Sequence, residues 1–268
     1  MSQLTPRCIA FVSPVGGTGQ TTVVANLASL WCAAGLACLA VDLCPQNSLG
    51  LHLGLRQAPV AGWASSMQAD QWWADAALEN SSQVPFLPFG CPPLQADAPP
   101  LQHLHQRLAQ DPQWLRQQLQ AVDLPDHTLV LLDAPSAAQA LTTQALRCAD
   151  LMVVCLDASP RSPLQQAQVQ ALVAQARLGT RVALLVTRFN PRRASQCLAM
   201  AQLQQQWPGQ LAPYVLHDDE NVAAALAAAH CVTAYAPQSQ SAHDLHGIAR
   251  WLLAQCPPDE PAAGDLDP

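Results

Sequence analysis

The sequence predicts an α/β protein built on a doubly wound, mostly parallel sheet that is flanked by helices. Five short apolar runs predict buried strands at residues 8–12, 37–41, 128–132, 151–156 and 181–186. Their apolar character is continuous rather than alternating, which is typical of parallel strands covered on both faces. A longer segment with helical spacing follows each run, and strands that alternate with helices indicate a doubly wound sheet.

The rest of the chain fits one domain over residues 1–256. Helical spacing predicts helices at residues 21–34, 101–122, 137–148, 163–178, 194–207, 221–229 and 242–255. Residues 84–87 are a candidate for one more strand. Four prolines in residues 91–100 predict a surface loop, and the proline-rich, acidic residues 257–268 predict a flexible tail.

The charged residues exclude one class of site and disfavour another. All 12 basic residues are arginines, against 19 acidic residues and a net charge of −7. A lysine-dependent active site is therefore excluded. A surface for polyanions needs clustered basic residues, and the only adjacent basic pair is Arg192–Arg193. We therefore expect no direct nucleic-acid binding.

The apolar composition and the cysteines indicate a cytoplasmic protein with a large core. Half of the residues are apolar, yet no uninterrupted apolar stretch reaches the roughly 18 residues of a membrane span. The ten cysteines form no Cys-x-x-Cys pair, and most lie in apolar runs, where a free cysteine behaves as a small hydrophobe. We find no secretory signal and expect reduced thiols.

The first predicted strand leads into a glycine-rich loop at the start of a helix. The loop contains Gly16, Gly17, Thr18, Gly19, Gln20, Thr21 and Thr22. Glycines let consecutive N–H groups point at one anion, and the helix N-terminus adds free N–H groups and partial positive charge. Thr21 can reach a magnesium ion, and Thr22 can bind a phosphate. The alternative is a tight turn in which Thr21 only caps the helix.

Two acidic residues end predicted strands. Asp42 follows one apolar run and Asp133 another, and ligands gather at the carboxyl ends of strands in open α/β sheets. With Thr21, they predict a magnesium site. The alternative for Asp42 is that it caps the next turn, and an apolar run followed by Asp is common in α/β proteins.

The loop resembles the deviant P-loop of the MinD/ParA class of ATPases, whose pattern is Lys-Gly-Gly-x-Gly-Lys-Thr-Thr. Val15 stands where that class has the lysine that reaches across the dimer, and Gln20 where it has the ordinary P-loop lysine. The resemblance implies that the chain binds ATP and Mg²⁺ and that Val15 lies at a dimer contact. Loss of one charge-assisted hydrogen bond costs about 1.5–3 kcal/mol, so binding can survive while hydrolysis suffers more.

Further segments resemble the same class. A switch is expected at Cys44, Pro45, Gln46 and Asn47, where Cys44 replaces the aspartate thought to orient water. The resemblance implies that nucleotide-binding positions also include Thr187, Arg188, Asn190, His217, Asp218 and Asp219. We interpret His217 as a pocket wall or surface residue rather than an acid–base catalyst, and Arg188 as a surface arginine. We predict no catalytic residue.

A narrower resemblance, to the BcsQ family of cellulose-biosynthesis accessory proteins, rests on several features. In the N-terminal half they are the missing P-loop lysine, the Asp-x-Cys-Pro segment at Asp42, Gly62-Trp63-Ala64, and Leu87-Pro88-Phe89-Gly90. In the C-terminal half they are His217-Asp218-Asp219-Glu220 and Pro237. The resemblance implies a nucleotide-bound homodimer that assembles with a small regulatory subunit and other subunits of the cellulose synthase complex. It also implies a cytoplasmic location, peripheral to the inner membrane.

Any membrane association is expected to come through partners, because the last predicted helix carries a single arginine, Arg250. Two functions remain open. One is an ATP-binding regulatory or assembly subunit with weak or absent hydrolysis. The other is an active MinD/ParA-like ATPase that drives a positioning cycle, with an arginine replacing the lysine. We expect Trp63, Trp72 and Trp73 in the core rather than at an interface.

Overall fold

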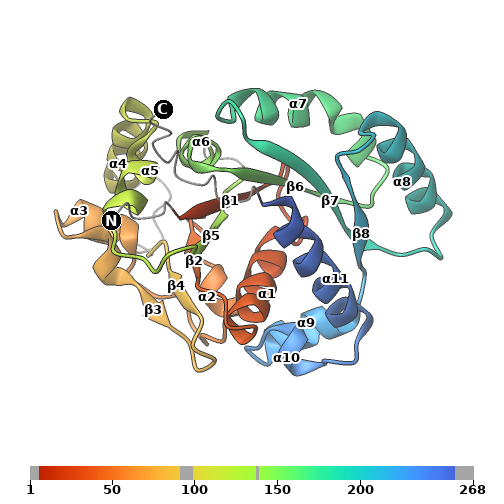
Figure 1. The fold of residues 1–268 in the computed structure, drawn as a ribbon, viewed down its shortest axis with the longest axis horizontal. Helices are drawn as coiled ribbons and strands as arrows, with labels where there is room; N and C mark the ends of the chain where they lie inside the picture. Colours follow the sequence, from red (N-terminus) through yellow and green to blue (C-terminus); the bar gives the residue numbers. More distant parts are fainter. Residues whose placement is uncertain (1–5, 91–98, 137–138, 257–268) are drawn as a thin grey trace, which may run out of the picture.

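The computed structural model describes residues 6–90, 99–136 and 139–256. In this part of the chain one eight-stranded sheet runs in the order β3-β4-β2-β5-β1-β6-β7-β8 (Figure 1). The strands are β1 (Arg7–Val12), β2 (Cys38–Asp42), β3 (Leu78–Glu79), β4 (Pro85–Leu87), β5 (Leu129–Asp133), β6 (Leu151–Asp157), β7 (Arg181–Phe189) and β8 (Leu211–His217). Every pairing is parallel except β3 with β4, so the predicted fold class is confirmed.

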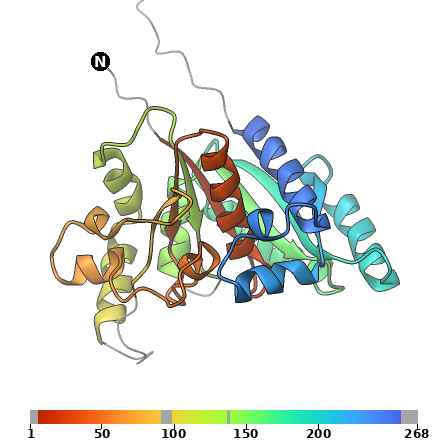
Figure 2. The ribbon, with the colours of Figure 1, turned by 90° about the horizontal axis from the view of Figure 1, so that it is seen from below.

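Helices cover both faces of the sheet (Figures 1 and 2). One face carries α1 (Gln20–Ala33), α2 (Leu49–His52), α9 (Glu220–Ala227), α10 (Val232–Tyr235) and α11 (Gln240–Gln255). The other carries α3 (Trp63–Gln68), α4 (Pro99–Gln110), α5 (Trp114–Ala121), α6 (Gln139–Cys148), α7 (Gln166–Gln175) and α8 (Ala194–Gln206). The short 3-10 helices η1 (Trp73–Ala76) and η2 (Ser162–Gln165) lie in the connections.

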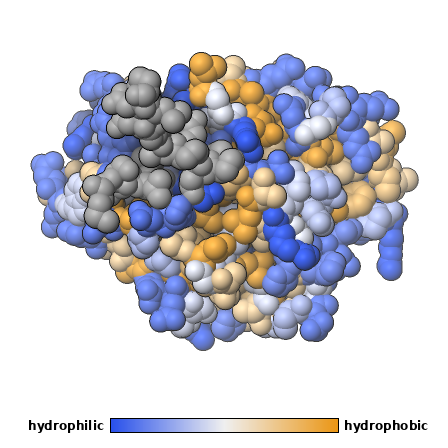
Figure 3. Space-filling model, viewed as in Figure 1, coloured by the Kyte–Doolittle hydropathy of each residue, from blue (hydrophilic) through white to orange (hydrophobic). Residues whose placement is uncertain are grey.

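Two hydrophobic cores, one on each face, explain the continuous apolar runs. In β5, Val130 and Leu132 belong to one core, while Leu129 and Leu131 belong to the other. Successive side chains of a strand point to opposite faces, so a strand covered twice must be apolar at every position. The surface differs: in the view of Figure 3, hydrophilic residues dominate the rim of the face, and hydrophobic patches lie nearer its middle.

The structure corrects several predicted elements. Residues 101–122 form two helices rather than one, with the break at Asp111–Gln113, because Pro112 has no N–H for a helical hydrogen bond. The edge strand β8 was not predicted, since Pro213 interrupts its short apolar run and a proline argues against a central strand. The strand expected at residues 84–87 is present as β4. The predicted tail lies outside the described residues, as do residues 91–98 of the predicted loop, whereas Pro99 and Pro100 open α4.

The register of the sheet places the two predicted acidic residues side by side. Asp42 ends β2 and Asp133 ends β5, and their Cα positions are direct partners in the parallel ladder. The glycine-rich loop leaves the neighbouring strand β1 at the same edge. Within the described ranges, no helix has both the length and the apolar character required to cross a bilayer.

Candidate functional site

A cleft of about 900 Å³ opens at this edge of the sheet. Most of the predicted site residues line it: residues 15–22, Cys44, Gln46, Thr187, Arg188 and residues 217–219. The structure therefore brings the loop after β1, the loop after β2 and the ends of β7 and β8 around one space. Their roles in binding remain predictions.

Besides the two carboxylates described below, three predicted residues do not line the cleft. Pro45 lines a neighbouring cavity between α4 and α6. Asn47 is buried, and its side-chain amide donates to the Pro59 carbonyl oxygen at 2.6 Å. Asn190 is not among the lining residues, and its Oδ1 accepts from the Arg192 N–H at 3.0 Å. Asn190 thus holds a local turn and Asn47 binds the segment at Pro59, while the nucleotide contact expected of Asn190 stays a prediction.

The glycine-rich loop has the backbone shape that its glycines allow. Gly17 and Gly19 have φ values of 79° and 76°, a left-handed conformation that costs other residues energy. The Thr187 hydroxyl donates to the Thr18 carbonyl oxygen, and Nη1 of Arg188 donates to the Gly17 carbonyl oxygen at 2.9 Å. Two donors from β7 thus hold loop carbonyl groups, which fits a loop that offers its N–H groups to an anion.

Gln20 does not point a free donor into the cleft. Its side-chain Nε2 donates to Oδ1 of Asp133 at 2.6 Å and to the Ala134 carbonyl oxygen at 2.7 Å. An amide nitrogen carries two hydrogens, so both are used. The side chain is buried, and the position that holds the lysine of the resembling class is here tied to the end of β5.

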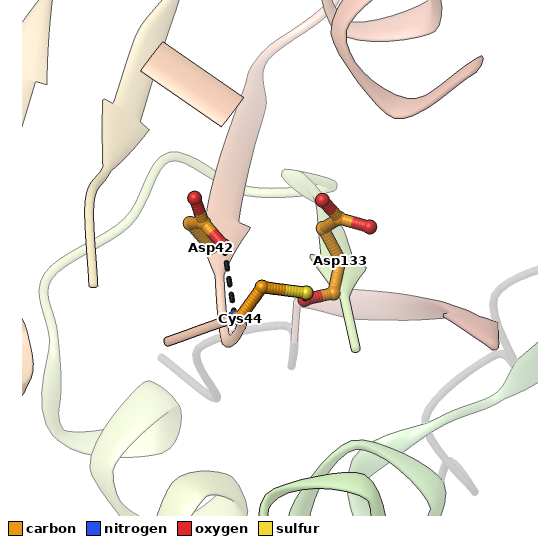
Figure 4. Close-up of side chains that lie close together, drawn as sticks. All are labelled: Asp42, Cys44 and Asp133. Atoms are coloured by element: carbon orange, nitrogen blue, oxygen red, sulfur yellow. Dashed lines mark hydrogen bonds between the residues drawn. The ribbon is translucent and has the colours of Figure 1, made fainter. Parts of the chain in front are cut away.

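Asp42 and Asp133 lie side by side beneath the cleft lining and are fully buried (Figure 4). Asp42 accepts from the backbone N–H of Cys44 at 2.8 Å and of Leu49 at 2.9 Å, one on each oxygen. Asp133 accepts from Gln20 on Oδ1, while its buried Oδ2 has no hydrogen-bond partner within 3.5 Å among the described residues. Asp42 therefore shapes the loop after β2, and Asp133 keeps one oxygen available.

Burial controls the protonation of this group. It raises the pKa of Asp133 to about 6, although interactions with Thr21 and Gln20 offset part of the rise. Burial and the neighbouring charge of Asp133 raise the pKa of Asp42 well above its usual range. Burial, followed by the two carboxylates, also raises the pKa of the Cys44 thiol, so the free thiol is neutral.

The donor set suits a hard cation better than a soft one. Ligand atoms of Asp42, Cys44 and Asp133 lie within 4.8 Å of one another. Magnesium prefers oxygen ligands and keeps several waters, and the free Oδ2 of Asp133 and the Thr21 hydroxyl at the cleft are such donors. The residues present therefore fit a hydrated magnesium ion near Thr21 and Asp133, with Asp42 behind them.

The ends of β7 and β8 form the far wall of the cleft. Arg188 is exposed, as expected, but its φ of 55° and its bond to Gly17 bring it to the loop. The His217 ring lies with Nδ1 2.8 Å from Oδ2 of Asp244, which suits a wall residue. Asp219 caps α9 through the Asn221 N–H at 2.9 Å, so its carboxylate serves the fold.

Sequence reasoning missed several residues of the lining. His52, Ser136 and Leu226 face the same cleft. Burial lowers the pKa of His52 to about 4, so its ring is neutral. His52 comes from the four-residue helix α2, which has no periodic pattern to reveal it. Ser136 comes three residues after Asp133, and that proximity was an available signal.

Comparison with known proteins agrees with this geometry. The family described as "Cellulose biosynthesis protein BcsQ" matches residues 7–253. The cellulose biosynthesis protein BcsQ of Escherichia coli K12 is 34% identical over 241 residues, covering 89% of this chain and 90% of that protein. BcsQ of Salmonella typhimurium is 30% identical over 254 residues, covering 94% and 96%.

The fold also matches a solved structure of the septum site-determining protein MinD from Pyrococcus horikoshii, in complex with Mg-ADP. The TM-score is 0.74 at 21% identity, over 93% of this chain and 98% of that one. At this identity the likeness concerns the fold, which is that of MinD/ParA-type P-loop ATPases. The family match, by contrast, extends over nearly all of the described residues, and the chain belongs to the BcsQ family of cellulose biosynthesis proteins.

Proposed function

We propose that this protein is an ATP-binding regulatory or assembly subunit of the bacterial cellulose synthesis and secretion machinery, with weak or absent hydrolysis. Membership of the BcsQ family supports the process. The glycine-rich loop, the adjoining cleft and the fold shared with a Mg-ADP-bound MinD support the ligands, ATP and Mg²⁺. Residues 1–256 act as one nucleotide-binding domain in this proposal, and residues 257–268 as its tail.

The loop and the buried carboxylates have separate roles in this proposal. N–H groups of residues 16–19 and the start of α1 bind the phosphates, because a glycine loop and a helix N-terminus both present donors to an anion. Thr21 and Asp133 hold a hydrated Mg²⁺, which supplies positive charge beside the phosphates. Asp42 fixes the loop that carries Cys44 and Gln46 through its two backbone hydrogen bonds.

The proposal of slow hydrolysis rests on one observation, the fixed side-chain amide of Gln20. In phosphoryl transfer, negative charge on the transferring group must be met by cations placed in advance. Gln20 is neutral, and both of its donor hydrogens already bind Asp133 and Ala134. Cys44, neutral as well, stands where the MinD/ParA class has the aspartate thought to orient water. The backbone N–H groups that bind phosphate are still present, whereas two charged side chains that would assist hydrolysis are replaced by neutral ones.

The assembly proposed is a homodimer with nucleotide between the protomers. Val15 lines the cleft and lies at the dimer contact in this arrangement. Other subunits of the cellulose synthase complex, including a small regulatory subunit, are the expected partners. They hold the protein in the cytoplasm at the periphery of the inner membrane, and the acidic chain binds neither DNA nor lipid directly.

Single-turnover hydrolysis with radiolabelled ATP and Mg²⁺ tests this function, together with nucleotide affinity and oligomeric state. We expect the wild type to bind ATP and turn over far more slowly than a MinD protein measured alongside. Gln20→Lys is expected to increase turnover. Gln20→Ala is the matched control, because it releases Asp133 without adding charge and should remain slow. Wild-type turnover equal to that of MinD would refute the proposal.

The alternative, an active MinD/ParA-like ATPase that drives a positioning cycle, is favoured by one contact. Nη1 of Arg188 already reaches the Gly17 carbonyl oxygen from the side opposite Gln20. Among the described residues that line the cleft, it is the one arginine. In this function Asp133→Ala abolishes hydrolysis and Gln20→Lys changes it only modestly. An unmeasurable wild-type rate would end this alternative.

A further inference from the structure

The two short motifs at residues 62–64 and 87–90 lie against each other. The backbone N–H groups of Trp63 and Ala64 donate to the carbonyl oxygens of Pro88 and Phe89, both at 3.0 Å. The approach is so close that a Cβ added to Gly62 would lie 2.1 Å from the backbone nitrogen of Gly90. Thus the start of α3 is fixed to the segment that follows β4, and the Trp63 side chain has a defined position.

The Trp63 side chain links this fixed segment to the candidate site. Its indole N–H donates to the backbone carbonyl oxygen of Asp42 at 2.7 Å, and the residue is 1% exposed. The ring packs edge-on against Phe89, with centroids 5.1 Å apart, and lies 5.8 Å from Trp114 of α5. Packing on both sides prevents the indole from following Asp42 if the end of β2 moves.

Asp42 is the residue at which the sheet ends and the cleft-lining loop begins. Its carbonyl oxygen accepts from Trp63, and its carboxylate accepts from the N–H groups of Cys44 and Leu49. The next backbone bond, from the Leu43 N–H to the Asp133 carbonyl oxygen, is 2.9 Å long. A shift at Asp42 therefore passes directly to the loop that carries Cys44, Gln46 and Ser48 into the cleft.

We propose that Trp63 is a positioning residue for nucleotide binding. Its indole N–H holds the Asp42 carbonyl group and thereby fixes the end of β2. The Asp42 carboxylate, in turn, holds the loop that follows β2. The nucleotide part of this inference rests on the proposed function, whereas the effect of Trp63 on the loop does not. Loss of the indole donor leaves a buried carbonyl oxygen without this partner. The cost corresponds to a change of about ten-fold in the equilibrium constant for opening of the loop.

Trp73 offers a matched control within the same aromatic group. It is 3% exposed and lies 5.9 Å from Trp114, but its indole nitrogen has no hydrogen-bond partner among the described residues. Trp63→Phe and Trp73→Phe therefore remove the same atoms from one hydrophobic layer. Only the first removes a hydrogen bond, so the difference between them isolates the contact with Asp42.

Hydrogen exchange of the full chain without nucleotide gives the first test. We expect the amides of Cys44 and Leu49 to exchange about ten-fold faster in Trp63→Phe than in Trp73→Phe. Calorimetric titration with ATP and Mg²⁺ gives the second, with an expected ten-fold weaker affinity for Trp63→Phe alone. Equal exchange in the two variants overturns the inference. If the wild type binds no ATP, the proposed function fails, while the exchange result still decides the role of Trp63.

A measurement on the wild type covers the case in which Trp63→Phe does not fold. With ¹⁵N-labelled tryptophan, the indole N–H of Trp63 should exchange slowly before nucleotide is added. Its resonance should shift on addition of ATP and Mg²⁺, and that of Trp73 should not. A rapidly exchanging Trp63 signal, or one that stays unchanged while nucleotide binds, overturns the inference.

Discussion

Asp133→Asn should stabilise the nucleotide-free protein at neutral pH, although it removes a charged group from the proposed magnesium site. Burial raises the pKa of Asp133 from an ordinary value of 3.8 to about 6. The folded state therefore binds this proton more tightly than the unfolded state does. Its contribution to stability is present below about pH 4 and is lost as the pH rises to about 6.

The size of the effect follows from that pKa difference. Each pKa unit corresponds to about 1.36 kcal/mol, so a rise of about 2 units lowers the free energy of unfolding at neutral pH by about 3 kcal/mol. Asparagine keeps the oxygen that accepts from Gln20 at 2.6 Å and removes the buried charge. For a chain of this size, about 3 kcal/mol raises the melting temperature by about 6–12 °C.

Urea unfolding between pH 4 and pH 8, without nucleotide or magnesium, measures this prediction. We expect wild-type stability to fall across pH 4–6 relative to Asp133→Asn, and the variant to be the more stable above pH 6. Asp157→Asn is the control, and it should destabilise the protein at neutral pH. At Asp157 the effect of burial is outweighed by hydrogen bonds from Ser159, Ser162 and Arg161, which lower the pKa of this carboxyl group. A destabilised Asp133→Asn at pH 7.5, or parallel pH profiles, would refute the reasoning.

Three further predictions concern the backbone and the cleft wall. Gly62→Ala places a Cβ 2.1 Å from the backbone of Gly90, so we expect the free energy of unfolding in urea to fall by about 3 kcal/mol; unchanged stability would contradict the close approach. Asp219→Ala removes the cap of α9 and the acceptor for Ser241. It should cost about 1–2 kcal/mol, and thermal unfolding with Asp219→Asn as partial rescue measures it. Arg188 has a φ of 55°, so Arg188→Gly should be about 1 kcal/mol more stable than Arg188→Ala. Both variants should weaken ATP binding equally in calorimetry. An unchanged affinity would show that the Arg188 side chain does not contribute to phosphate binding.

Much of the fold could be predicted because its causes are local in the sequence. A strand buried on two faces must be apolar at every position, as in β5, so its run is visible without any knowledge of its neighbours. The elements that were missed lack such a signal. The edge strand β8 is half exposed and contains Pro213, and the break at Pro112 interrupts a helical pattern that continues on both sides.

The candidate site divides in the same way. The sequence by itself determined a glycine loop between a strand and a helix, acidic residues at two strand ends and the absence of every lysine, because each is a matter of residue type and local order. Only the tertiary structure decided what Gln20 does in place of lysine. Its amide binds Asp133, 113 residues away, because β1 and β5 are neighbours in the sheet. The bonds from Arg188 to Gly17 and from Trp63 to Asp42 likewise depend on register and packing between distant segments.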